Sequence, residues 1–495
     1  MHIAFLNPQG NFDPRDSHWT EHPDFGGQLV YVKEVAIALA RAGHRVDILT
    51  RQILDPAWPE FASLLDGYPG VDNLRILRIS CGPRRFLRKE DLWPWLGSEW
   101  VPRILAFYEE EGGLPDIFTA HYADGGLSAA LLERRTDIPF TFTAHSLGAQ
   151  KLEKLSAPPA DFAQLEARYH FRQRIAAERI SMNRAGVIIT STRQERMRQY
   201  GHPLYRGAVD VNDDRRFAVI PPGVNLRIFA HDRASNQEDA TQAAMEASLA
   251  RDLPPARRSL PLILISARLD PKKNHLGLFR AYAQNPELQA RANLALVVRG
   301  TDAPLREIER FPAHEQAVLR ACWEVVQAHG LEDKVVTLAL NSQQALAAAY
   351  RHLAQRRSLF CLPALYEPFG LAPLEAMAAG LPVVVTRHGG PSESLRDEIT
   401  GKTFGVLVDP DDPADIARGL LRPLQDAALW RRLRQAGIQR VRSRYTWEQT
   451  ARGYETALRA VLAAREPIPQ WFLNPAIPDL PALDVDNRLS AVAQT

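Results

Sequence analysis

Short apolar segments alternate with longer stretches of helical periodicity along almost the entire chain of 495 residues. A helix-like pattern at residues 29–42, for example, separates the first two apolar segments. Such alternation predicts β-α-β units, and therefore parallel sheets whose connections are helices. In the first half of the chain the apolar segments are residues 3–6, 46–50, 117–120, 140–144 and 187–190.

The pattern begins again around a Pro-rich hinge at residues 217–224. The apolar segments that follow are residues 262–265, 294–298, 335–338, 359–362 and 383–386. We predict an α/β protein with two Rossmann-like, doubly wound parallel-sheet domains, residues 1–216 and 217–450, that face a central cleft. Ligands bind such sheets at the carboxyl ends of the strands. The polar residues 231–259 predict a mobile helical excursion, and residues 451–495 predict a C-terminal helix and tail packing back on the first domain.

Composition excludes several classes of partner. Sixty basic and fifty-eight acidic residues give a net charge of +2, which argues against a dedicated nucleic-acid binder. The three scattered cysteines are too few for a disulfide framework or a zinc site. The N-terminus lacks the features of a signal peptide, and no apolar run is long enough to span a bilayer. The sequence therefore predicts a cytoplasmic protein that binds neither nucleic acid nor membranes.

Two cations follow the first apolar strand of the second domain. Arg268 lies at the carboxyl end of that strand, and Lys273 lies five residues later, where a loop leads into a helix. Cations next to the free N–H groups of a helix start can bind a diphosphate without a Walker loop. A solvated charge cluster is the alternative, but the position directly after a buried strand favours a binding site.

Two glutamates lie eight residues apart around a Pro-Phe-Gly turn. Glu367 stands just past the strand predicted at residues 359–362, and Glu375 lies on the first turn of a helix that begins near residue 372. Carboxylates there can accept hydrogen bonds from sugar and ribose hydroxyls, while the N–H groups of residues 369–372 meet phosphate oxygens. Taken alone, Glu375 has a plain structural explanation as a glutamate stabilised near a helix N-terminus.

The first domain carries weaker signals. Gly26, Gly27 and Gln28 lie between its first strand and helix, but they form no G-x-G-x-x-G fingerprint, so they do not indicate dinucleotide binding. His145 follows a strand and could bind a sugar hydroxyl, although a lone histidine is more often structural. The same two interpretations, binding or structural, apply to Asp124 in the segment His121-Tyr122-Ala123-Asp124.

A basic segment opens the helix that we expect to begin at Arg168 and to run to about residue 183. Arg168 and Arg172 share one face of that helix, and Arg174 points elsewhere. Together with Lys89, Arg172 and Arg174 could clamp a phosphate on an acceptor. A basic, solvated helix face explains the spacing equally well.

These motifs together match a known family. The sequence resembles the retaining GT-B glycosyltransferases of the family 4 type, and within them it is similar to bacterial sucrose-phosphate synthases. The segments that carry the resemblance are Gly26-Gly27-Gln28, Arg268 with Lys273, Asn341-Ser342-Gln343, Glu367 through Glu375, and the narrower matches at residues 24–33, 145–151, 172–179 and 190–195. Related sequences carry a lysine two residues before Arg172, where this chain has His170.

The resemblance implies transfer of glucose from UDP-glucose to fructose 6-phosphate, giving sucrose 6-phosphate. The α-configuration of the donor would be retained by a front-face mechanism without a covalent enzyme intermediate. Glu367 would therefore position the sugar rather than attack it. The implied catalytic residues are Glu367, Arg268, Lys273 and His145. The implied donor-binding residues are Gly27, Arg268, Lys273, Arg299, Asn341, Glu367, Phe369, Gly370, Leu371 and Glu375. The implied acceptor-binding residues are Gly26, Gln28, Lys89, Tyr122, Asp124, Arg172 and Arg174.

Several alternatives stay open at the level of sequence. A sucrose synthase would use free fructose, and a mannosylfructose-phosphate synthase would use a GDP-sugar; ADP- or GDP-glucose could also replace UDP-glucose. The complete donor set argues against an inactive nucleotide-binding scaffold. No metal-ligand cluster accompanies the donor motifs, so the sequence requires no Mg²⁺ and predicts no tightly bound cofactor. Since the product would carry a phosphate, a separate sucrose-phosphate phosphatase is an expected partner.

Overall fold

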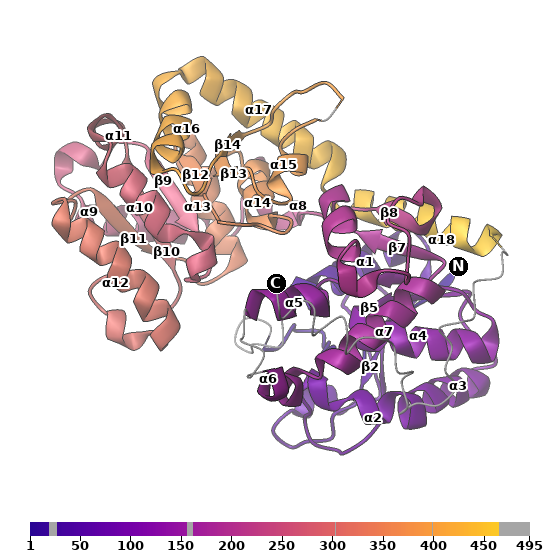
Figure 1. Cartoon of the computed structure of the whole chain (residues 1–495). Coiled ribbons are helices and arrows are strands. Elements are labelled where there is room, and N and C mark those ends of the chain that lie inside the picture. The colour runs from indigo at the N-terminus through magenta and orange to yellow at the C-terminus, as the bar shows by residue number, and fades with distance from the viewer. Residues whose placement is uncertain (19–26, 156–161, 302, 398, 465–495) are drawn as a thin grey trace. The chain divides into compact units, whose positions relative to one another are not determined.

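The computed structural model describes residues 1–18, 27–155, 162–301, 303–397 and 399–464. The chain divides into two compact units (Figure 1). Of the described residues, those in 1–221 and 450–464 belong to unit 1, and those in 222–449 belong to unit 2. None of the helices described is long and apolar enough to cross a membrane.

Unit 1 is built on an eight-stranded sheet with the order β3-β4-β2-β1-β5-β6-β7-β8. The short β3 is antiparallel to β4, and the other neighbouring strands are parallel. The strands are β1 His2–Leu6, β2 Arg45–Arg51, β3 Leu65–Asp66, β4 Leu74–Ile79, β5 Ile117–His121, β6 Phe140–Thr143, β7 Val187–Thr190 and β8 Phe217–Val219. The helices are α1 Gly27–Arg41, α2 Trp93–Trp95, α3 Val101–Glu110, α4 Tyr122–Thr136, α5 Gly148–Leu155, α6 Phe162–Tyr169, α7 Phe171–Arg184 and α18 Trp447–Ala463.

The last strand of this sheet lies where the sequence suggested the start of the second domain. β8 pairs in parallel with β7, so the chain leaves unit 1 only at Pro221. It returns with α18, whose Tyr454 hydroxyl lies 3.1 Å from the Tyr31 hydroxyl and 3.2 Å from Thr143 Oγ1. A three-residue strand is too short for its pattern to reveal which sheet it joins.

A buried ionic network stabilises the amino ends of β1 and β2. The Asp47 carboxylate is fully buried, and it accepts hydrogen bonds from Arg75 at 2.8 and 2.9 Å and from the Tyr108 hydroxyl at 2.9 Å. It also lies 2.7 Å from His2 Nε2. These hydrogen bonds outweigh the effect of burial, which acts in the opposite direction, and they lower the pKa of Asp47 to about 2.

Unit 2 is built on a six-stranded, fully parallel sheet with the order β11-β10-β9-β12-β13-β14. The strands are β9 Leu262–Ser266, β10 Asn293–Val298, β11 Val335–Ala339, β12 Leu359–Leu362, β13 Val383–Thr386 and β14 Val406–Val408. The helices are α8 Leu226–Phe229, α9 Glu238–Asp252, α10 His275–Ala283, α11 Pro286–Arg291, α12 Ala313–Ala328, α13 Gln343–Gln355, α14 Leu371–Ala378, α15 Pro391–Ser394, α16 Pro413–Gln425 and α17 Ala427–Arg444. Two parallel-sheet units confirm the predicted fold class.

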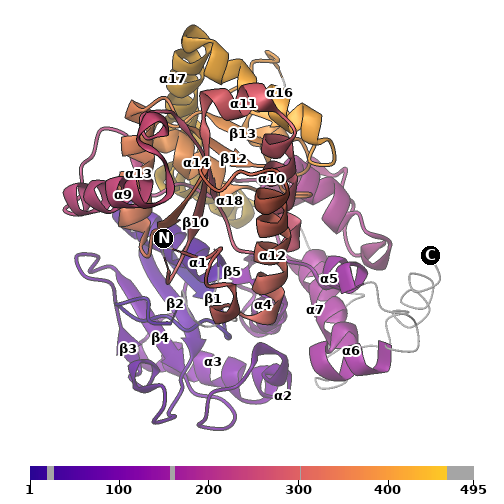
Figure 2. The ribbon, with the colours of Figure 1, turned by 90° about the vertical axis from the view of Figure 1, so that its left-hand side faces the viewer.

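The polar segment at residues 231–259 does not form the mobile excursion that its composition suggested. Its helix α9 packs against α13 and β11, as Figure 2 shows for the two helices. Met245 and Leu249 of α9 are 1% and 0% exposed, and they belong to the core of unit 2. Two well-placed apolar side chains anchor this helix although the segment as a whole is polar.

The basic segment near Arg168 also differs from the prediction of one continuous helix. His170 adopts a left-handed conformation with φ 49° and separates α6 from α7. Its N–H donates to the Glu166 carbonyl at 2.9 Å, a bond that closes the end of α6. Arg168 therefore lies on α6, and Arg172 and Arg174 lie on α7.

Candidate active site

The strand order of unit 2 places the donor motifs at a topological switch point. β9 is flanked by β10 on one side and β12 on the other, so the chain connections diverge on either side of β9. Ligands of doubly wound sheets bind in the crevice that this divergence opens at the carboxyl ends of the strands. Arg268 and Lys273 follow β9 and Glu367 follows β12, so the three residues come from the two strands at this point.

The predicted cation and carboxylate form a direct ion pair. Lys273 Nζ lies 2.6 Å from Glu367 Oε2, and both side chains are largely buried. Arg268 is exposed, and its guanidinium makes no hydrogen bond or ion pair with any residue that the structure describes. The site therefore holds one cation that a carboxylate neutralises and one that is available for an anion.

Asn274, which the sequence analysis did not select, holds the loops of this site together. It adopts a left-handed conformation with φ 56° and caps α10 through a bond from the Gly277 N–H to its Oδ1. Its Nδ2 donates to the carbonyls of Pro363 at 3.0 Å and Pro410 at 2.8 Å, which lie after β12 and β14. An asparagine directly before a helix is a recognisable capping signal, but its two long-range bonds are not.

A second set of residues that the sequence analysis missed supports the backbone of Glu367. The Gly390 N–H donates to the Glu367 carbonyl at 2.9 Å, and the Glu367 N–H donates to the His388 carbonyl at 3.2 Å. Gly389 has φ 94°, and a Cβ atom there would lie 2.0 Å from the Glu367 carbonyl oxygen. Only glycine fits this position, and a Gly-Gly-Pro turn after β13 is the signal that could have revealed it.

Glu375 lies on α14, near the predicted diphosphate site. The helix begins at Leu371 after Gly370, whose φ of 92° favours glycine, so Phe369, Gly370 and Leu371 bring free N–H groups to this edge. Glu375 is the fifth residue of α14 and lies on its second turn, not on the first as predicted. Its carboxylate has no partner among the described residues, and burial raises its pKa to about 7.

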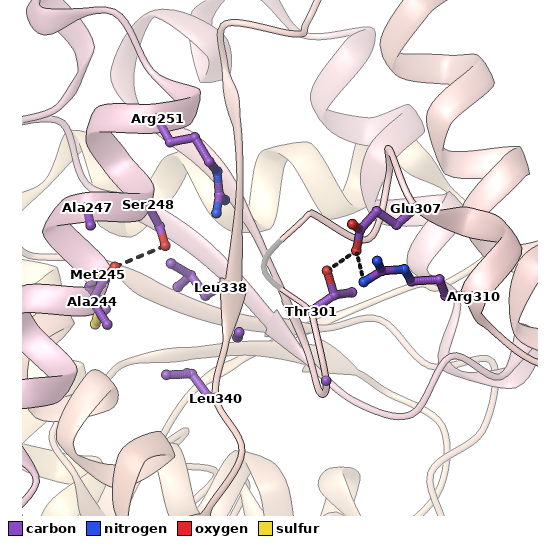
Figure 3. Close-up of a pocket in the computed structure, with 12 residues that line it drawn as sticks. Ala244, Met245, Ala247, Ser248, Arg251, Thr301, Glu307, Arg310, Leu338 and Leu340 are labelled. Atoms are coloured by element: carbon purple, nitrogen blue, oxygen red, sulfur yellow. Dashed lines mark hydrogen bonds and ion pairs between the residues drawn. The ribbon is translucent and has the colours of Figure 1, made fainter.

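The predicted donor-binding residues Arg299 and Asn341 lie on neighbouring loops. The Gly300 N–H donates to Asn341 Oδ1 at 3.0 Å, which ties the loop after β10, with Arg299, to the loop after β11. A hollow of about 620 Å³ opens beside these loops (Figure 3). Its lining includes Met245, Ser248 and Arg251 of α9, Gly300, Thr301 and Glu307 of the loop after β10, and Leu338 and Leu340 of the β11 end.

Unit 1 has its own switch point, between β1 and β5, and the predicted glycine loop lies there. Gly26 lies outside the described residues. Gly27 begins α1 and is exposed, and Gln28 Nε2 donates to Asn7 Oδ1 at 2.7 Å. The loop after β1 and the start of α1 are thereby held together at the edge where ligands bind.

His145 follows β6 at the same edge. It has φ 57°, and the Ser146 N–H donates to the Ala144 carbonyl at 2.6 Å across this tight turn. The ring packs edge-on against Tyr31 at 4.9 Å between centroids and lies 2.9 Å from His121 Nδ1. Burial lowers the pKa of His145 to about 3, so the ring is neutral at physiological pH.

Two of the predicted acceptor residues lie beside the aromatic ring of a third. Lys89 Nζ lies 6.0 Å and Arg174 Cζ 4.6 Å from the ring centroid of Tyr122, the first residue of α4. Asp124 is 2% exposed on the same helix, its Oδ2 has no partner among the described residues, and burial raises its pKa to about 7. Lys89, Tyr122, Asp124 and Arg174 therefore come together.

Arg172 and Arg174 have different surroundings. Arg174 is 4% exposed, and it donates to Glu178 Oε1 at 2.9 Å and to the Ser146 carbonyl at 2.6 Å. Arg172 is exposed, and its guanidinium lies 5.1 Å from the ring centroid of Phe162 on α6. Among the described residues, Nη1 of Arg174 forms no hydrogen bond, so this side chain keeps part of its donor capacity.

Comparisons with known proteins show which family the chain resembles. Residues 26–211 match the family model "Glycosyl transferase 4-like domain", and residues 252–440 match "Glycosyl transferases group 1". A Thermosipho melanesiensis protein named "Probable sucrose-phosphate synthase" is 41% identical over 92% of this chain and 95% of its own length. The "Sucrose-phosphate synthase" of Zea mays is 31% identical over 95% of this chain, which spans only 48% of that longer protein.

A solved structure is similar to this chain over both units. The sucrose-phosphate synthase from Thermosynechococcus elongatus superposes with a TM-score of 0.65 at 26% identity, covering 93% of this chain and 99% of that one. The fold is therefore that of the GT-B glycosyltransferases, and the chain is a hexosyltransferase. The identity to the Thermosipho protein extends over nearly the full length of both chains. This protein belongs to the sucrose-phosphate synthase family.

Proposed function

We propose that this enzyme transfers glucose from UDP-glucose to fructose 6-phosphate, forming sucrose 6-phosphate with retention of the α-configuration. The donor half of the proposal rests on the Lys273–Glu367 ion pair and on Arg268, whose guanidinium has no partner among the described residues. The names of the relatives support a phosphorylated sugar acceptor.

The nucleotide-sugar lies along the carboxyl edge of the unit 2 sheet. Arg268, Lys273 and the N–H groups at the start of α14 stabilise the negative charge that develops on the leaving diphosphate. The Glu375 carboxylate accepts hydrogen bonds from the ribose hydroxyls, which supply the partner that it lacks among the described residues. The base lies against the loops joined by Gly300 and Asn341, next to the 620 Å³ hollow.

Glu367 positions the glucosyl unit and forms no bond to it. Its Oε2 is held by Lys273 at 2.6 Å, and its backbone is fixed by hydrogen bonds to the loop after β13. An ion-paired carboxylate is a poorer nucleophile because its charge is already neutralised. The departing phosphate shields one face of the sugar and takes the proton of the incoming hydroxyl on that same face, so the configuration is retained.

Fructose 6-phosphate binds at the edge of unit 1 that carries Lys89, Tyr122 and Asp124. The side chains of Lys89 and Arg174 both lie beside the Tyr122 ring, and the Lys89 ammonium and Nη1 of Arg174 bind the acceptor phosphate. The product is a phosphate ester, so we propose that a separate phosphatase consumes it. The donor motifs supply the positive charge that the leaving diphosphate needs without a metal ion.

One observation favours a second candidate, a sucrose synthase that uses free fructose. Arg174 already has an internal counter-ion in the buried Glu178, which also accepts bonds from the Gly148 N–H and the Tyr205 hydroxyl. A guanidinium neutralised in this way attracts a phosphate less strongly than a free one.

A substrate matrix tests both candidates. Purified protein is offered UDP-, ADP- and GDP-glucose, each with fructose and with fructose 6-phosphate, and nucleotide release is measured. The anomeric configuration of the product is then read by NMR. We expect the fastest turnover with UDP-glucose and fructose 6-phosphate and an α-linked product. Faster turnover with free fructose would refute the proposal in favour of the second candidate.

A pair of variants separates the two substrate sites. Arg268→Ala should raise the KM for the nucleotide-sugar and leave the KM for fructose 6-phosphate nearly unchanged, and Lys89→Ala should do the reverse. Arg174→Ala should raise the KM for fructose 6-phosphate more than the KM for the donor. Equal effects of Arg174→Ala on both values would remove this residue from the acceptor site.

A further inference from the structure

We propose that His121 is a positioning residue that fixes the tautomer of His145, so that His145 presents an Nδ1–H donor to the substrates. The placement of the two rings carries this inference. His121 ends β5, and its Nδ1 lies 2.9 Å from His145 Nε2, with the ring planes only 26° apart. A hydrogen bond between two neutral imidazoles needs one protonated and one unprotonated nitrogen, so the two tautomers are coupled.

A chain of hydroxyl groups decides in which direction this bond runs. The Thr141 hydroxyl donates to Thr119 Oγ1 at 2.9 Å, so Thr119 is left with its own proton to donate. The His121 Nε2 lies 3.4 Å from Thr119 Oγ1, two residues earlier on the same face of β5. An Nε2 that accepts this proton leaves His121 protonated at Nδ1, and that N–H must donate to His145 Nε2.

The surroundings keep both rings neutral and in place. His121 is fully buried, stacked on Phe5 at 5.3 Å between centroids with an interplanar angle of 7°. Burial lowers the pKa of His121 well below its ordinary value, and it lowers that of His145 as well. Because neither imidazole is charged, one proton is shared between His121 Nδ1 and His145 Nε2. The threonine hydroxyls determine that His121 carries it.

His145 then carries its own proton on Nδ1. Among the described residues this nitrogen has no hydrogen-bond partner, and the half-buried ring leaves it accessible. An Nδ1–H in this position donates to a hydroxyl or phosphoryl oxygen, whereas the opposite tautomer would offer only an acceptor. Only this last step, from tautomer to substrate, rests on the proposed function.

The tautomer can be read directly by ¹⁵N NMR of histidine-labelled protein without substrate. The signals of His145 are identified by their loss in His145→Asn. In the wild type we expect a protonated Nδ1 and an unprotonated Nε2. Thr119→Val removes the hydroxyl proton, and we expect His145 to change toward the Nε2–H form, while Thr119→Ser, which keeps the hydroxyl, retains the wild-type pattern. A protonated Nε2 in the wild type, or an unchanged pattern in Thr119→Val, would overturn the inference.

Kinetics then separates positioning from simple structural support. Loss of one neutral hydrogen bond changes rates by roughly 2- to 10-fold. Thr119→Val should therefore lower kcat by about that factor with little change in either KM, and Thr119→Ser should restore it. Equal thermal unfolding midpoints of the two variants exclude a folding defect. If no nucleotide-sugar is turned over at all, the proposed function fails, while the NMR result still decides the tautomer.

Discussion

The half-buried side chain of Glu375 leads to a prediction about stability that needs no substrate. Its pKa is raised from 4.5 to about 7 because the charged form is partly removed from water without a partner among the described residues. The folded state thus holds this proton more tightly than the unfolded state, and stability is lost as the pH rises from 4.5 to about 7. Each pH unit in that window costs about 1.4 kcal/mol, so the full cost above pH 7 is about 3 kcal/mol.

Glu375→Gln removes the charge and keeps the shape of the side chain. At pH 8 we expect the variant to be more stable than the wild type by up to about 3 kcal/mol, and at pH 5.5 by only about 1 kcal/mol. For a unit of this size, the larger value raises the unfolding midpoint by roughly 6 to 12 °C. Differential scanning calorimetry at the two pH values measures both gains, and comparison at equal pH cancels the titration of all other groups.

A matched control is Glu324→Gln on the exposed face of α12, which should change stability by less than about 0.5 kcal/mol at either pH. The same Glu375→Gln protein should bind the nucleotide-sugar more weakly, because a ribose loses a charged acceptor. A variant that is no more stable than the wild type at pH 8, or equally more stable at both pH values, would refute the reasoning.

Three further predictions concern other residues. Lys273→Ala should lower kcat by about 100- to 1,000-fold in a nucleotide-release assay. Near-normal turnover would contradict a leaving-group role. As a control, Lys272→Ala, which changes the exposed neighbouring lysine, should leave kcat unchanged. Gly389→Ala should lower the free energy of unfolding by about 3 kcal/mol or more, because the new methyl group lies 2.0 Å from a carbonyl oxygen at φ 94°. Gly401→Ala, with φ 68° and open space around it, should cost only about 1 kcal/mol in the same urea titration, and equal losses would rule out the close approach as the cause. Asp47→Asn should lower the free energy of unfolding by about 3 to 5 kcal/mol, because it removes the buried anion that accepts hydrogen bonds from Arg75 and from the Tyr108 hydroxyl. Since the pKa of Asp47 is lowered to about 2, its contribution is present above pH 3.8 and lost as the pH falls toward 2, so the difference between variant and wild type should shrink in acid.

Much of the fold, and the edge of the sheet on which the candidate residues of unit 2 lie, could be predicted because both depend on local pattern. A buried parallel strand is a continuous apolar run, so β9, β12 and β13 were predicted within a residue of their bounds. Residues directly after such strands share one edge of the sheet whatever the details of packing. Arg268, Lys273 and Glu367 could therefore be assigned to one site from their positions in the chain alone.

What the sequence could not predict depends on contacts between distant segments. Nothing in the order of residues shows that Glu178 neutralises Arg174, or that Asn274 bonds to the loops after β12 and β14. The left-handed turn at His170 was hidden because histidine carries no strong turn signal. His121 has the sequence pattern of an ordinary core residue, and only the fold brings its ring beside His145.

The two long-range hydrogen bonds of Asn274 have a consequence for how unit 2 moves. One amide group joins the loops after three strands of the sheet, so these loops cannot fluctuate independently. These loops therefore lose most of their conformational entropy when the protein folds, and little remains to be lost when a ligand binds. Nucleotide binding to unit 2 should then leave amide hydrogen exchange in these loops almost unchanged, as expected for a surface that is ordered before its ligand arrives.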